Sequence, residues 1–102
     1  MERRVVVTGM GAITPIGNNV REFFDGLVKS KCGIDNITLF DTTNFKVKLA
    51  AEVKEYNPED YFDRRSAKRL DRFSQFAMIA AREAMKDSMI DETNTDMERV
   101  GI

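Results

Sequence analysis

The chain has 102 residues, with 16 Lys or Arg side chains against 17 Asp or Glu side chains and a net charge of -1. Hydrophobic residues make up 42%, enough for a packed core, which excludes intrinsic disorder and low-complexity classes. No apolar run approaches the roughly 18 residues of a membrane span, and no signal-peptide core follows the charged start. We expect one domain at most, cytoplasmic and without a membrane partner.

The sequence contains one cysteine, Cys32, and no histidine. These counts exclude a Ser-His-Asp or Cys-His catalytic group and a zinc site built from the usual ligands. Cys32 falls at the C-terminal end of a predicted helix, where the helix dipole disfavours a thiolate, so we expect an inert thiol. If the chain is part of an enzyme that uses such groups, we expect them to lie elsewhere, and we expect no metal site and no cofactor in this chain.

The first third of the chain predicts a strand, a loop and a helix. Three adjacent valines in residues 3–8 are typical of a short strand buried on both faces. Residues 9–18 hold three glycines and a proline, and we expect these glycines to adopt positive φ. Apolar residues at helical spacing then predict a helix over 20–28, with Asn19 and Glu22 as a capping box and Gly33 as its C-terminal cap.

The rest of the chain predicts a second strand and further helices. Apolar and charged residues alternate over 45–53, which indicates a half-buried strand, and Asn57 and Pro58 are typical of a helix start. Residues 73–85 have helical spacing with four alanines, which would let a neighbouring segment approach closely. Residues 91–96 resemble a polar connector, and residues 98–102 resemble the opening of another strand.

The glycine-rich loop matches no nucleotide-binding motif. Thr14 stands where the third glycine of G-x-G-x-x-G would be, and Asn18 stands where a P-loop has lysine. A structural loop is therefore favoured over a phosphate site. The alternative kept open is a free-standing small α/β ligand-binding module that uses the loop from Gly9 to Gly17.

A basic cluster is the main binding signal. Residues 64–72 carry five cations and one anion, a local charge of +4. Arg65, Lys68 and Arg69 have the spacing i, i+3 and i+4, so a helix here would place them on one face. Such a face suits an acidic protein helix or a phosphate group. Nucleic acid is disfavoured by the net charge and by the lack of interleaved aromatic residues, and a solvated surface is the alternative.

Several ordered motifs resemble one family. Residues 4–11 (RVVVTGMG) and 14–18 (TPIGN) resemble the opening of the beta-ketoacyl-acyl-carrier-protein synthases, especially type II. Residues 33–34, 40–42, 71–76 and 80–84 match the family in the same order, so the resemblance covers essentially the whole chain. Thr14 replaces a frequent serine, and Met89 replaces a glycine that often follows Asp-Ser.

The resemblance implies that residues 1–102 are part of the N-terminal domain of a thiolase-like, layered αβαβα fold, truncated before the catalytic elements. It implies a condensing enzyme of fatty acid synthesis, in which a cysteine accepts an acyl chain and malonyl carried by acyl carrier protein is decarboxylated for a Claisen condensation. The family's catalytic cysteine and two histidines have no counterpart in these residues. By position, Arg65, Lys68 and Arg69 would dock acyl carrier protein, with Arg64 less certain, and the parent protein is expected to be a homodimer.

Overall fold

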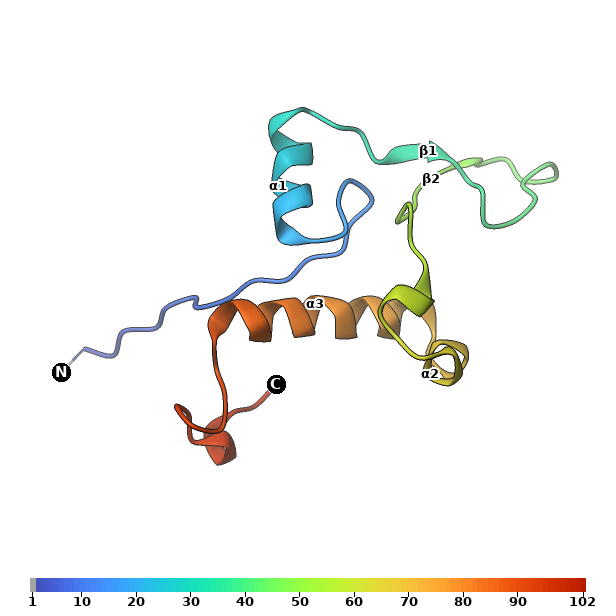
Figure 1. Cartoon of the computed structure of the whole chain (residues 1–102). Helices are drawn as coiled ribbons and strands as arrows, with labels where there is room; N and C mark the ends of the chain where they lie inside the picture. The colour runs from blue at the N-terminus through green and yellow to red at the C-terminus, as the bar shows by residue number, and fades with distance from the viewer. Residues whose placement is uncertain (1) are drawn as a thin grey trace.

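The computed structural model describes residues 2–102 as an open arrangement of helices around one long helix (Figure 1). Residues 2–13 are extended, and seven short or regular elements follow in chain order: α1 (Val20–Val28), β1 (Ile34–Asn36), β2 (Leu49–Ala51), the 3-10 helix η1 (Pro58–Asp60), α2 (Arg64–Arg69), α3 (Arg72–Ser88) and the 3-10 helix η2 (Met97–Arg99). The long helix α3 lies between the N-terminal segment and α2.

The helix α1 is confirmed over the predicted range, together with its N-terminal cap. The Asn19 side chain accepts a hydrogen bond from the backbone N–H of Glu22 at 2.9 Å, which satisfies one of the free donors of the first turn. The Glu22 carboxylate reaches back to the N–H of Asn18 rather than to that of Asn19. The prediction for the other end was wrong: Lys29 is the C-terminal cap, and Gly33 lies beyond it.

The predicted N-terminal strand is not formed. Residues 3–8 are extended but have no strand partner among residues 2–102, and the side chains of Val5 and Val7 are 94% and 81% exposed. An extended segment becomes a strand only when a neighbouring strand supplies hydrogen bonds. The three valines therefore present an unpaired apolar edge rather than a buried one.

The glycines at positions 9 and 11 lie against the backbone of α3. A Cβ added at Gly9 would overlap the carbonyl oxygen of Ala84, and one added at Gly11 would overlap that of Ala80. The prediction of positive φ was wrong, because no glycine in the described part of the chain has it. The prediction that alanines permit close approach is confirmed: the segment and the helix touch where neither has a bulky side chain.

Two carboxylates of α3 hold this segment in place. The N–H of Met10 donates to Asp87 Oδ2 at 3.0 Å, and the N–H of Ala12 donates to Glu83 Oε1 at 2.9 Å. Glu83 also accepts from the N–H of Val20, the first residue of α1. One side chain of α3 therefore orients both the N-terminal segment and the positive end of the α1 dipole.

The two strands form a small antiparallel hairpin. Ile34 pairs with Ala51, and Asn36 pairs with Leu49, so the observed strand is much shorter than the predicted range of 45–53. Phe45 and Val47 are exposed and lie outside the ladder. Apolar and charged residues alternate over 45–53 as in a strand with one apolar face, but only residues 49–51 have a partner strand.

The C-terminal residues form turns rather than the opening strand that the sequence predicts. Asp91 accepts hydrogen bonds from the N–H groups of Thr93 and Asn94, which confirms a polar connector. The 3-10 helix η2 follows, and residues 100–102 are not in a strand. Met89 ends α3 with φ 59 and ψ 21, a left-handed conformation usually occupied by glycine.

The chain buries very little apolar surface. Phe62 and Ile79 are the buried hydrophobic side chains in the described part. The accessible surface is 9003 Å², against about 5,800 Å² expected for a compact protein of this mass. The radius of gyration is 17.4 Å, against about 13 Å for a compact domain of 100 residues. These residues therefore expose most of the apolar surface that a compact domain of this size would bury.

Candidate functional site: the basic helix α2

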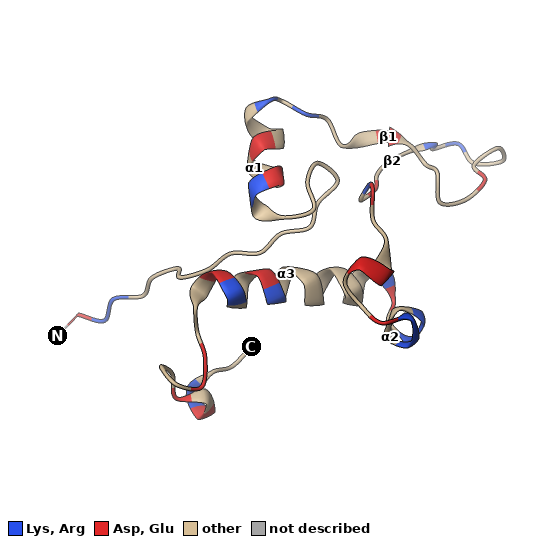
Figure 2. Cartoon of the chain, viewed as in Figure 1, with Lys and Arg blue, Asp and Glu red and all other residues tan. Residues whose placement is uncertain are grey.

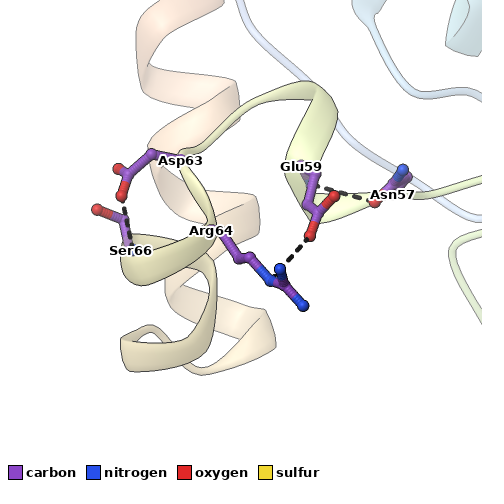
Figure 3. A network of polar contacts seen from close by, with 5 residues as sticks. All are labelled: Asn57, Glu59, Asp63, Arg64 and Ser66. Atoms are coloured by element: carbon purple, nitrogen blue, oxygen red, sulfur yellow. Dashed lines mark hydrogen bonds and ion pairs between the residues drawn. The ribbon is translucent and has the colours of Figure 1, made fainter.

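The helix α2 is short, and side-chain caps fix the start of α2 and of the 3-10 helix before it. Asp63 is its N-terminal cap and accepts from the N–H of Ser66 at 3.2 Å. Asn57 caps the preceding 3-10 helix by accepting from the N–H of Glu59 at 3.1 Å (Figure 3). Hydrogen bonds from the side chain and then the backbone of Ser66 hold the pKa of Asp63 below its usual value, so this cap is charged at neutral pH.

The three predicted docking residues all lie on α2, and all are exposed. Arg65, Lys68 and Arg69 are within the helix Arg64–Arg69, so the expected i, i+3 and i+4 spacing places them on one face. None of the three has a carboxylate within 4.0 Å among residues 2–102. Figure 2 shows Lys and Arg gathered on α2, beside the start of α3. The face is available to an anionic partner.

Two other cations of the basic cluster are engaged within the chain. The Arg64 guanidinium lies 3.9 Å from the Glu59 carboxylate, an exposed pair shown in Figure 3. Arg72 lies over the rings of Tyr56 and Phe76, 5.1 Å and 5.2 Å from their centroids, and it donates to the carbonyl of Val53 at 3.1 Å. The exposed cationic face of α2 therefore consists of three of the five cations of residues 64–72.

A buried glutamine, which the sequence analysis missed, joins α2 to α3. Gln75 donates from Nε2 to the carbonyls of Ala67 at 2.9 Å and Leu70 at 3.0 Å. Its Oε1 accepts from the hydroxyl of Tyr56. No sequence pattern marked this residue: Gln75 follows Ser74, and at helical spacing it shares a face with Arg72, so it resembles an exposed polar residue. Its burial depends on partners outside α3.

The geometry of the glycine-rich loop disfavours the alternative ligand site. The N–H groups of Met10 and Ala12 already donate to carboxylates of α3, which would repel a phosphate. Beyond them, the N–H groups of Thr14 and Gly17 pair with each other's carbonyls. Phosphate-binding loops need free N–H groups that point to the ligand. This loop instead packs within the chain.

The described residues contain no group of three His, Cys, Asp or Glu side chains placed to hold a metal ion. Cys32 is an exposed free thiol beyond the end of α1. No helix within residues 2–102 combines the length and apolar character needed to cross a bilayer.

Comparisons with known proteins agree on one family. The family model for the beta-ketoacyl synthase N-terminal domain matches residues 2–102. The chain is 47% identical over 100 residues to the 3-oxoacyl-[acyl-carrier-protein] synthase 2 of Staphylococcus aureus strain N315, covering 98% of this chain and 24% of that protein. It is 43% identical over 97 residues to the synthase of the same name from Synechocystis, covering 93% of this chain and 23% of that protein.

A solved structure agrees with the sequence comparisons. A chain of the ishigamide ketosynthase/chain length factor superposes with a TM-score of 0.79 at 36% identity, over 92% of this chain and 23% of that chain. The expected fold class, the N-terminal part of a thiolase-like α/β fold, is confirmed by this match. The chain spans about a quarter of the length of the curated relatives it matches. The chain belongs to the beta-ketoacyl synthase family, and its residues 2–102 match the model of that family's N-terminal domain.

Proposed function

We propose that this chain is part of a 3-oxoacyl-[acyl-carrier-protein] synthase that elongates acyl chains in fatty acid synthesis. The reaction is a decarboxylative Claisen condensation with malonyl carried by acyl carrier protein. In such a reaction an activated thiolate accepts the acyl group as a thioester while the carrier thiol leaves, and fixed donors stabilise the developing enolate and oxyanion. These residues supply none of the cysteine and histidine groups for those steps. Family membership over residues 2–102 supports this proposal.

The role of these residues is scaffolding and docking. The exposed apolar surfaces of the N-terminal segment and α3 would be covered by the rest of the synthase, which we expect to be a cytoplasmic homodimer. Sedimentation analysis of the complete protein tests the dimer. The proposed domain assignment is that residues 1–102 are one portion of the synthase N-terminal domain rather than a free-standing unit.

The observation that carries the docking role is the exposed face of Arg65, Lys68 and Arg69 on α2. Acyl carrier protein is acidic and bears a phosphopantetheine arm, so a cationic face favours encounter and orients the partner. An exposed ion pair contributes about 0.2–1 kcal/mol. Three such contacts therefore shift affinity by about one order of magnitude or more.

Charge reversal tests the docking role. In the complete synthase, Lys68→Glu with Arg69→Glu removes two attractions and adds two repulsions, about 2 kcal/mol in all. We expect KM for the acyl carrier protein substrate to rise about 30-fold with kcat nearly unchanged, and the rise to shrink at high salt because exposed charges are screened.

The matched control reverses two exposed lysines near β2, Lys46→Glu with Lys48→Glu, which changes the net charge by the same amount away from α2. We expect KM to remain within about twofold, since these charges lie outside the proposed contact. Equal effects from both double variants would mean that net charge, not the α2 face, steers the carrier protein. An unchanged KM in the α2 variant would refute the docking assignment.

A further inference from the structure

Gln75 is the buried polar side chain of the described chain, with 5% of its surface exposed. A buried amide is costly unless its donors and acceptor are satisfied. Here both ends of the amide are used: Nε2 donates to two carbonyls at the end of α2, and Oε1 accepts from Tyr56. Its polar partners come from outside α3, so the amide connects α3 to other elements.

Tyr56 fixes which way this amide points. Burial raises the pKa of Tyr56 above its usual value, an effect that the nearby Arg72 charge opposes in part, so the phenol keeps its proton at neutral pH. A phenol that donates to Oε1 leaves the NH₂ group facing the carbonyls of Ala67 and Leu70. The Tyr56 ring is itself held edge-on to Phe76, with centroids 5.0 Å apart, and under the Arg72 guanidinium.

The helix α2 depends on such support. It has only six residues, and an isolated helix of this length is not stable in water. A helix also leaves its last carbonyls without partners inside the helix. Asp63 satisfies a donor at the N-terminal end, and Gln75 satisfies carbonyls at the C-terminal end. Together they determine where the face of Arg65, Lys68 and Arg69 is held.

We propose that Gln75, oriented by Tyr56, is a positioning residue that holds the cationic face of α2 for the carrier protein. The inference rests on the proposed docking function of that face. Gln75 acts at a distance from the partner: it is buried, whereas the three cations are exposed. Its loss should therefore change recognition of the carrier protein through α2 and leave the chemical step intact.

The test uses Gln75→Leu in the complete synthase, which replaces the side chain with an apolar one of similar size and removes the amide. We expect KM for the acyl carrier protein substrate to rise about fivefold with kcat unchanged. Turnover of an acyl-pantetheine thioester, which lacks the carrier protein, should not change. Ser74→Ala, one position earlier and free of side-chain hydrogen bonds to residues 2–102, is the matched control and should leave both substrates unaffected.

A double-mutant cycle separates positioning from general destabilisation. Adding Gln75→Leu to Lys68→Glu with Arg69→Glu should cause little further rise in KM, because the position of α2 matters only while its charges attract the partner. Full multiplication of the two effects would overturn the inference. Equal losses on the carrier-protein substrate and the small thioester would also overturn it, since they would indicate a structural role alone.

Tyr56→Phe keeps the proposal testable if Gln75→Leu folds poorly. It preserves the ring contacts with Phe76 and Arg72 and removes only the hydroxyl that orients the amide. We expect KM for the carrier protein to rise about twofold to threefold, with the small thioester unaffected. If charge reversal raises KM while both variants leave it unchanged, Gln75 positioning is refuted and docking stands. If charge reversal itself has no effect, the docking proposal and this inference both fail.

Discussion

Replacing Gly11 with alanine should separate the N-terminal segment from α3. The added Cβ would overlap the carbonyl oxygen of Ala80, and its next neighbours are the carbonyl carbon of Ala80 and the backbone N of Ala84. Backbone atoms of a helix cannot move aside as a flexible side chain can. The φ of Gly11 is not in the left-handed region, so the effect of the substitution is steric and comes without backbone strain.

The destabilisation caused by Gly11→Ala follows from the hydrogen bonds that break when the N-terminal segment moves away from α3. The hydrogen bonds from Met10 to Asp87 and from Ala12 to Glu83 both flank the substituted residue. A hydrogen bond to a charged acceptor contributes about 1.5–3 kcal/mol, and the Asp87 side is exposed, where the lower end applies. We therefore expect Gly11→Ala to destabilise the segment by about 3 kcal/mol.

Hydrogen exchange of the complete protein, read by mass spectrometry, measures this locally. The N–H groups of Met10 and Ala12 should exchange about 100-fold faster in Gly11→Ala, since about 3 kcal/mol corresponds to roughly two orders of magnitude in the opening equilibrium. Gly101→Ala is the matched control, because a Cβ there meets no atom within 4 Å. Unchanged exchange at both N–H groups in Gly11→Ala would refute the close packing of this segment on α3.

Two further predictions concern helix ends. Met89 occupies a left-handed conformation at φ 59, which costs a non-glycine residue about 1 kcal/mol, so Met89→Gly should slow unfolding-linked exchange at the end of α3; faster exchange would contradict this. The lowered pKa of Asp63 means that its cap stabilises α2 above pH 3.8 and that this contribution is lost as pH falls through the folded-state pKa. In Asp63→Asn, the hydrogen-exchange protection of the Ser66 N–H should no longer depend on the charge of residue 63, so the loss of protection at acid pH should be smaller. The same loss of protection in both proteins would exclude the Asp63 cap as its cause.

The predictable parts of this chain are those governed by neighbours in sequence. The stripe of residues 20–28 and the Asn19 cap act within two turns, so α1 appears where its pattern predicts it. The same holds for the cap of Asn57 and for α3. Arg65, Lys68 and Arg69 share a helix because their spacing and the Asp63 cap are local features. Their role toward a carrier protein stays a prediction.

The parts that could not be predicted depend on partners distant in sequence. Valines over residues 5–7 have the composition of a buried strand, but pairing needs a second strand, and none lies beside them in the described chain. Glycine is the usual residue type at a helix C-terminal cap, which is why the sequence predicts Gly33 there. Instead Ser30, three positions earlier, adopts the left-handed conformation with φ 54. Gln75 meets Tyr56 across 19 positions, a distance at which periodicity carries no information.

The helix α3 contacts both the N-terminal segment and α2. Its turns at Ala80 and Ala84 lie against the glycines of the N-terminal segment. More than one turn earlier, its Gln75 donates hydrogen bonds to carbonyls at the C-terminal end of α2. These contacts lie on different turns and share no side chain, so their effects should be nearly additive. Gly11→Ala should therefore loosen the N-terminal segment without altering KM for the carrier protein, whereas Gln75→Leu should do the reverse. A Gly11→Ala variant that weakened carrier-protein recognition as much as Gln75→Leu would show instead that α3 transmits displacement along its length.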